Sequence, residues 1–194
     1  MLQFIGYGNH ETSVIKNQET DILQRFADVF NLTHRPDNPI EVGGYGGAVA
    51  FSYQPYKDSG ASTKVMKYFH GSGGGGIVTK GVIQNQRAMA IYQGYDIIWM
   101  GHVHELYHHT DIVERFMQAS YQVEQRAVDI VRTSTYKDEY EDGAQGWHIE
   151  RGAGPKPLGG YWLKFDIVKS KRDKNGRRPK DFIISNFNQC TRAY

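Results

Sequence analysis

The sequence predicts an α/β protein with a partly parallel β-sheet. Short apolar runs typical of buried strands occur at 65–69 and at 96–100. Between them, residues 80–93 carry apolar side chains at helical spacing, and Gly94 provides a helix stop. A strand, a helix and a second strand in this order are typical of neighbouring parallel strands with a helical crossover.

The N-terminal part adds a strand and a helix to this pattern. Residues 2–7 predict a short strand that runs into a loop at residues 8–11. Residues 20–31 predict an amphipathic helix with Thr20 as N-cap and an apolar face that packs into the core. Two prolines then precede a glycine-rich stretch and a β-like run at 48–53.

The C-terminal third has a stronger β pattern. Residues 123–135 are rich in Val, Ile and Thr, and apolar strand-like runs follow at 162–168 and 181–186. Asn175-Gly176 lies between the last two runs and is the strongest short hairpin signal in the chain. The sequence therefore predicts a C-terminal β-hairpin around residues 161–187, after a linker rich in Gly and Pro at 152–160.

Length and composition indicate a single domain over residues 1–194. A net charge of +2 gives no global signal for binding polyanions. The single cysteine, Cys190, excludes an internal disulfide and is typical of a reducing compartment. The sequence shows neither a secretory leader pattern nor an apolar run long enough to span a bilayer, so we expect a cytoplasmic protein without membrane partners.

Three histidine motifs, each just after an apolar strand-like run, are the candidate functional residues. They are Gly8-Asn9-His10-Glu11, Phe69-His70-Gly71 and Gly101-His102-Val103-His104. Strand ends are where sheet-based enzymes present side chains to a site, and imidazole and amide groups are metal ligands or proton carriers. The three motifs therefore predict one shared site.

In residue type and order, the motifs resemble the second half of the calcineurin-like metallophosphoesterase pattern. That resemblance implies a sandwich of two mixed β-sheets flanked by helices and a two-metal centre that hydrolyses phosphoesters. It implies that Asn9, His70 and His102 ligate one metal ion and that His104 ligates the other. It also implies that His10 stabilises the transition state or protonates the leaving group, and that Glu11 orients His10 or its loop.

The ligand types suit Mn, Fe, Zn or Ni, and a complete site of this family holds two such ions. An extended segment at 101–104 would place both histidines on one side, each facing a different ion. The family's Asp-x-His and Gly-Asp-x-x-Asp motifs, which come first in its pattern, are absent. We therefore expect a fold incomplete at the N-terminus, at most one weakly held metal ion, and self-association or a partner chain that supplies the missing half.

Three further features have simpler interpretations. The basic segment at 169–180 is expected to be a solvated hairpin tip, or alternatively a DNA or RNA contact, through Lys171, Arg172, Lys174, Arg177 and Arg178. The glycine run at 71–76 lacks a P-loop lysine and predicts a flexible loop near the substrate phosphate. His108 and His109 are expected at the surface.

The leading functional hypothesis is metal-dependent hydrolysis of phosphoesters. The alternative is a non-catalytic remnant or accessory subunit that keeps the fold without turnover, and a third possibility is a nuclease subunit of the same superfamily. The residues leave open monoesters against diesters, the identity of the metal and the physiological substrate.

Overall fold

The computed structural model describes residues 2–54, 60–74, 76, 78–138, 140, 143, 146–150, 152–168 and 182–192. The helices are α1 (Asn9–Gln18), α2 (Ile22–His34), α3 (Val82–Ile91) and the short α4 (Trp147–Glu150). The strands are β1 (Phe4–Ile5), β2 (Glu41–Val42), β3 (Gly46–Tyr53), β4 (Ser62–Phe69), β5 (Ile97–Met100), β6 (Tyr107–Met117), β7 (Gln122–Arg132), β8 (Gly159–Val168) and β9 (Phe182–Thr191). The protein is a mixed α/β structure.

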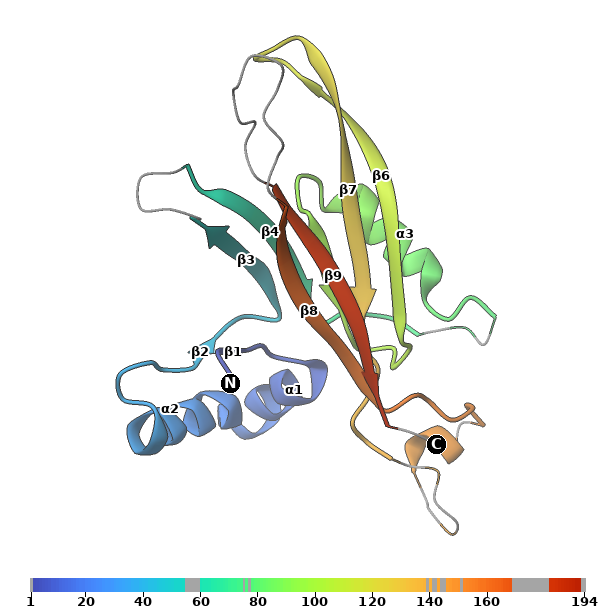
Figure 1. The fold of residues 1–194 in the computed structure, drawn as a ribbon. Coiled ribbons are helices and arrows are strands. Elements are labelled where there is room, and N and C mark those ends of the chain that lie inside the picture. The colour runs from blue at the N-terminus through green and yellow to red at the C-terminus, as the bar shows by residue number, and fades with distance from the viewer. Residues whose placement is uncertain are drawn as a thin grey trace.

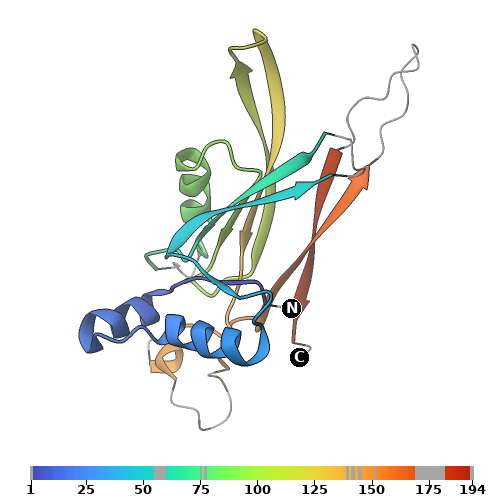
Figure 2. The same ribbon diagram turned by 90° about the vertical axis from the view of Figure 1, so that its left-hand side faces the viewer.

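A five-stranded mixed sheet in the order β3-β4-β5-β7-β6 forms the centre of the molecule (Figure 1). Strands β4, β5 and β7 are parallel, whereas the outer strands β3 and β6 run antiparallel to their neighbours. Residues Phe69, Met100 and Arg132 are in register at the carboxyl ends of the parallel strands. Helices α1 and α2 lie beyond this end of the sheet in both Figure 1 and Figure 2.

Helix α3 covers one face of this sheet, and the β8–β9 hairpin lies over the other (Figure 2). The face under α3 holds the main core, because Ala88 packs with Ile98 and Met100 of β5 and with Val128 and Ile130 of β7. These strand residues are two apart and so point to the same face. The predicted strand–helix–strand unit is thus confirmed, with β4 and β5 parallel as expected.

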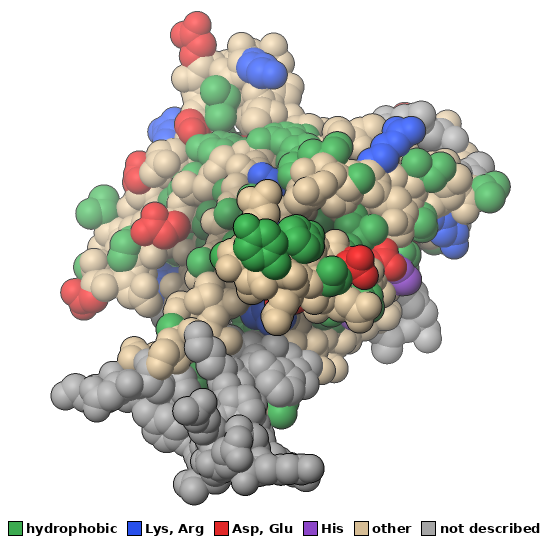
Figure 3. Space-filling view, turned by 90° about the horizontal axis from the view of Figure 1, so that it is seen from above, with side chains coloured by type: hydrophobic (Ala, Val, Ile, Leu, Met, Phe, Trp, Pro, Cys, Tyr) green, Lys and Arg blue, Asp and Glu red, His purple; other side chains and the backbone are tan. Residues whose placement is uncertain are grey.

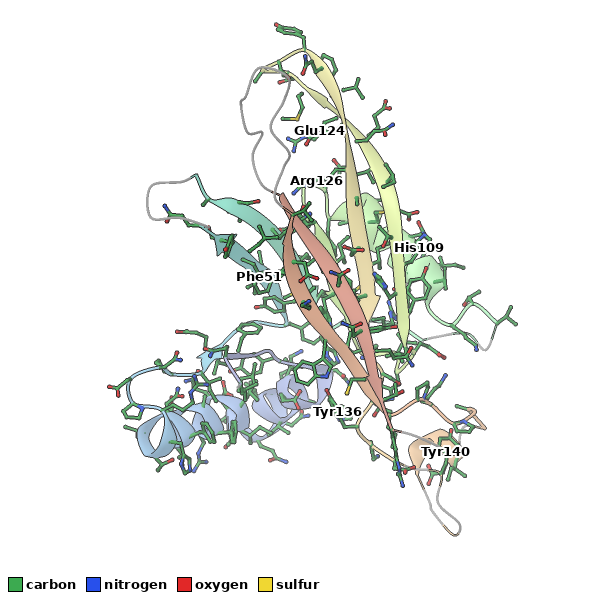
Figure 4. The ribbon with its side chains drawn as sticks, viewed as in Figure 1. Phe51, His109, Glu124, Arg126, Tyr136 and Tyr140 are labelled. Carbon is green, nitrogen blue, oxygen red and sulfur yellow. The ribbon has the colours of Figure 1, made fainter. Side chains whose placement is uncertain are left out.

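The second layer is held by aromatic pairs between the sheet and the hairpin. Phe51 of β3, labelled in Figure 4, lies with its ring centroid 4.8 Å from that of Phe165 in β8. Trp99 of β5 lies 6.1 Å from Phe187 of β9. The predicted C-terminal hairpin is confirmed as ten antiparallel pairs, while its expected Asn175-Gly176 turn lies outside the described residues. The family's sandwich of two mixed sheets stays a prediction.

Three local expectations were wrong. The loop expected at residues 8–11 is the start of α1, which begins at Asn9 after Gly8 as N-cap. The N-cap of α2 is Asp21 rather than Thr20, because the Asp21 carboxylate accepts a hydrogen bond from the Gln24 N–H at 2.9 Å.

The third correction concerns the apolar face of α2. On the predicted apolar face, Ile22, Phe26 and Val29 have exposed fractions of 46%, 49% and 63%, so this face is not the core contact that the sequence predicts. Ala27 is the fully buried residue of α2. The helix is therefore packed along a narrower stripe than its apolar pattern indicates.

Exposed hydrophobic side chains also occur on the β6–β7 ribbon, at Ile112, Phe116, Tyr121 and Val123. Figure 3 shows the molecule from this end, with hydrophobic groups among scattered charges. Within the described ranges, no helix is both long enough and apolar enough to cross a membrane.

The core under α3 makes a direct stability prediction. Ile98 has no exposed surface, so Ile98→Ala should lower the free energy of unfolding by about 2–5 kcal/mol through lost burial and a cavity. Ile112→Ala is the matched control, because Ile112 is 64% exposed, and we expect a change within about 0.5 kcal/mol. Urea unfolding followed by circular dichroism measures both, and equal effects would contradict this location of the core.

Candidate metal centre

Three of the predicted ligands converge at the carboxyl ends of β4 and β5. His70 Nε2 lies 2.8 Å from Asn9 Oδ1, and His102 Nδ1 lies 3.3 Å from both of these atoms. The three residues come from segments that are 61 and 93 positions apart in sequence. The structure thus brings together the three side chains that the family resemblance assigns to one metal ion.

Parallel strand pairing explains why the two histidines meet. His70 follows β4 directly and His102 lies two residues after β5, and parallel neighbours end at the same edge of the sheet. A hydrogen bond of 3.0 Å from the Gly101 N–H to the His70 carbonyl continues the strand pairing beyond both strands. Asn9 reaches the same edge from the first turn of α1.

Glycine at position 8 allows α1 to approach this closely. A Cβ on Gly8 would lie 2.8 Å from both His70 Cε1 and Glu11 Oε2. Glu11 Oε2 accepts a hydrogen bond from the Gly8 N–H at 2.9 Å, which satisfies an otherwise unpaired donor at the start of the helix. Glu11 therefore fixes the first turn of α1, and with it the position of Asn9.

The backbone at His102 is in an unusual conformation. His102 has a φ of 70°, and the Val103 N–H donates to the Gly101 carbonyl at 2.9 Å, which together describe a classic γ-turn. Such turns are rare and strained, and strained backbone tends to occur at functional sites. Gly71, with a φ of 104°, leaves room for this turn, because its Cβ would lie 3.0 Å from both Gly101 O and His102 Cβ.

The spacing of the three donor atoms fits a single first-row metal ion. Metal–nitrogen and metal–oxygen bonds of about 2.1 Å place ligand atoms about 3.0 Å apart at right angles and about 3.4 Å apart in a tetrahedron. The observed separations of 2.8, 3.3 and 3.3 Å fall close to this range. Within the described part of the chain, no group of three or more His, Cys, Asp or Glu side chains is placed to hold a metal ion. This trio contains two such side chains, and its third atom is the amide oxygen of Asn9.

The surroundings of His70 lower its pKa, which favours the neutral form that ligation requires. Burial is the main cause of this lowered pKa, and the proximity of His102 adds to it. Glu11 acts in the opposite direction, and His10 lowers the pKa further. His10 and Glu11 therefore both act electrostatically on His70.

Tyr45 is a supporting residue that the sequence did not indicate. Its carbonyl accepts from the His70 N–H at 2.9 Å, and its hydroxyl donates to the Gly71 carbonyl at 3.0 Å. Its ring lies edge-on to the His70 imidazole, with centroids 5.2 Å apart. A tyrosine between glycines carries no pattern that links it to a histidine 25 residues later.

The expected extended segment at 101–104 is wrong. His104 has a φ of 59° and follows the γ-turn at His102, so the chain turns at both histidines. The His104 carbonyl accepts from Ser134 Oγ at 2.7 Å. The alternation argument that placed the two histidines toward different ions therefore does not apply, and ligation of a second ion by His104 stays a prediction.

The other candidate residues lie away from this centre or outside the described residues. His108 and His109 are on β6, where their Nε2 atoms lie 3.3 Å from Asp129 and 2.9 Å from Asp111, respectively. Lys171, Arg172, Lys174, Arg177 and Arg178 are outside the described ranges. A cavity of about 450 Å³ at the carboxyl end of α3 is lined by Tyr92, Tyr95, Glu124 and Arg126 among others, and by none of the predicted site residues (Figure 4).

The close contact of Gly71 with the His102 turn can be tested by substitution. Gly71→Ala should lower the free energy of unfolding by about 1–3 kcal/mol, because alanine is strained at this φ and its Cβ meets a backbone oxygen. Gly74→Ala is the matched control, since a Cβ there meets nothing within 4 Å. Equal urea midpoints for the two variants would contradict the contact.

Comparisons with known proteins give no relative for this chain. No family model, no curated protein and no solved structure matches it. The chemistry of the centre therefore has to be argued from its own residues and their geometry.

Proposed function

We propose that this chain carries part of the di-metal centre of a metal-dependent phosphoesterase of the calcineurin-like type. The convergence of Asn9 Oδ1, His70 Nε2 and His102 Nδ1 within 3.3 Å of one another is the observation that supports it. The resemblance of the motifs extends the proposal to the family's sandwich fold, to Mn, Fe, Zn or Ni as cofactor and to a phosphate mono- or diester as substrate.

Each residue of the centre has a distinct task in this proposal. A metal ion bound here supplies Lewis acidity and a hydroxide nucleophile at neutral pH. His70 and His102 hold it through neutral imidazole nitrogens and Asn9 holds it through its amide oxygen. His10, exposed in the first turn of α1, protonates the leaving-group oxygen, while Glu11 keeps that turn in place.

A second candidate is a non-catalytic subunit that keeps the centre without turnover. The composition of the trio formed by Asn9, His70 and His102 favours it, because two imidazoles and an amide provide no bridging carboxylate for a second ion. Glu11, the carboxylate beside the trio, is engaged with the Gly8 backbone. A chain of this kind would bind one metal ion and need carboxylates from elsewhere for efficient hydrolysis.

Metal binding is the first test. We expect the chain to bind at most one Mn²⁺ or Zn²⁺ weakly, and His102→Ala to abolish that binding, because two donors give too little coordination. His109→Ala is the control, since this exposed histidine pairs with Asp111 away from the centre. Isothermal titration calorimetry measures both variants, and unchanged binding in His102→Ala would rule out the assigned ligands.

Turnover separates the two candidates. With added manganese, we expect hydrolysis of an aryl phosphate by this chain to be orders of magnitude below that of a complete di-metal enzyme. Any turnover that belongs to the centre should fall in both His70→Ala and His10→Ala, with metal binding kept only in His10→Ala. Metal binding without measurable turnover would favour the non-catalytic subunit, and turnover unaffected by both substitutions would exclude the proposed site.

A further inference from the structure

Arg132 is a buried cation that forms no ion pair with a carboxylate of the described residues. It is the last residue of β7 and only 1% of it is exposed. Its Nη1 donates to Gln84 Oε1 at 3.2 Å, its Nη2 lies 3.9 Å from the Met100 sulfur, and its Nε has no partner within the described residues. Burying an arginine with one neutral oxygen as its acceptor is costly, because the charge loses its hydration without gaining a counter-charge.

The start of α3 increases this excess of positive charge. A Cβ on Gly81, the N-cap of α3, would lie 2.8 Å from Arg132 Nη1, so the guanidinium lies against the N-terminus of this ten-residue helix. Helix N-termini carry partial positive charge, and α3 has neither a capping side chain nor an acidic residue in its first turn. The Arg132 guanidinium and the positive N-terminus of α3 are therefore in contact, away from solvent.

A second buried polar side chain at this helix start also lacks partners. Asn85, in the first turns of α3, has no exposed surface, and within the described chain both its Nδ2 and its Oδ1 are without hydrogen-bond partners. Helical spacing places Asn85 on the same side as Ala88, which packs on the sheet. The amide is therefore on the side of α3 from which Arg132 approaches.

The acidic group that acts on Arg132 is already engaged. Burial lowers the pKa of the guanidinium, and the charge of Glu105 opposes this effect. Glu105 forms an ion pair with Lys156, so its charge is shared. An arginine stays protonated in proteins, so the positive charge of Arg132 remains available to bind an oxyanion.

We propose that Arg132, Asn85 and the N-terminus of α3 form a binding site for a phosphate group. Guanidinium groups and helix N-termini commonly bind phosphate. An anion here would accept hydrogen bonds from Arg132 Nε and Asn85 Nδ2, which lack partners within the described chain. The site lies at the carboxyl end of β7, in register with Met100 and so at the same sheet edge as His70 and His102. Its use for the phosphate of a substrate rests on the proposed phosphoesterase function, whereas phosphate binding itself does not.

The test is phosphate-dependent stabilisation of the full chain in EDTA, which keeps the metal centre out of the result. Thermal unfolding is followed against inorganic phosphate or phenyl phosphate, at constant ionic strength set with sodium chloride. The wild-type melting temperature should rise with phosphate, because a ligand that binds the folded state stabilises it. Stabilisation by inorganic phosphate alone assigns a free-phosphate site, and stabilisation by phenyl phosphate as well assigns a phosphoester site.

Arg132→Met and Asn85→Ala should each raise the phosphate concentration for half-maximal stabilisation by about tenfold or more, because a hydrogen bond to a charged group is lost. Arg87→Met, on the exposed side of the same helix, is the matched control and should leave that concentration unchanged. The Asn85 variant keeps the test valid if the Arg132 variant does not fold. No phosphate effect on the wild type, or an equal effect in Asn85→Ala and Arg87→Met, would overturn the proposal and leave the metal centre unaffected.

Discussion

The parallel pairing of β4, β5 and β7 is the constraint on which the candidate sites depend. Because Phe69, Met100 and Arg132 are in register, three chain segments leave the sheet at one edge. Strand register therefore places the two histidines and the buried arginine at the same end of the sheet, although long stretches of chain separate them. A slip of one residue in either pairing would turn the affected side chains to the opposite face.

Chain segments approach each other closely at this end of the sheet because glycine occupies two positions where a side chain would not fit. Gly8 brings α1 against His70, and Gly71 lies against the strained turn at His102. Strain of this kind persists only when the surroundings hold it in place. Here strand pairing supplies that support, through the hydrogen bond from Gly101 to the His70 carbonyl. The fold itself thus holds Asn9, His70 and His102 close together.

Periodicity predicted the elements that carry a clear pattern, and failed where polar residues obscure one. The β4–α3–β5 unit and the C-terminal hairpin follow from their apolar spacing. Strand β6 was missed, because two histidines, Thr110 and Asp111 interrupt its alternation. The convergence of Asn9, His70 and His102 was predicted from the order of the three histidine motifs. Arg132 was not predictable, because a single arginine at a strand end looks the same whether it is solvated or buried.

The hydrogen bonds of Asn9 have a topological consequence. They join residues 61 and 93 positions apart, and closing a chain loop of that size carries an entropy cost that grows slowly with its length. Between α1 and the sheet, one amide oxygen therefore acts as a non-covalent cross-link. A ligand that binds all three side chains at once would strengthen this cross-link and stabilise the contact of the N-terminal helices with the rest of the molecule.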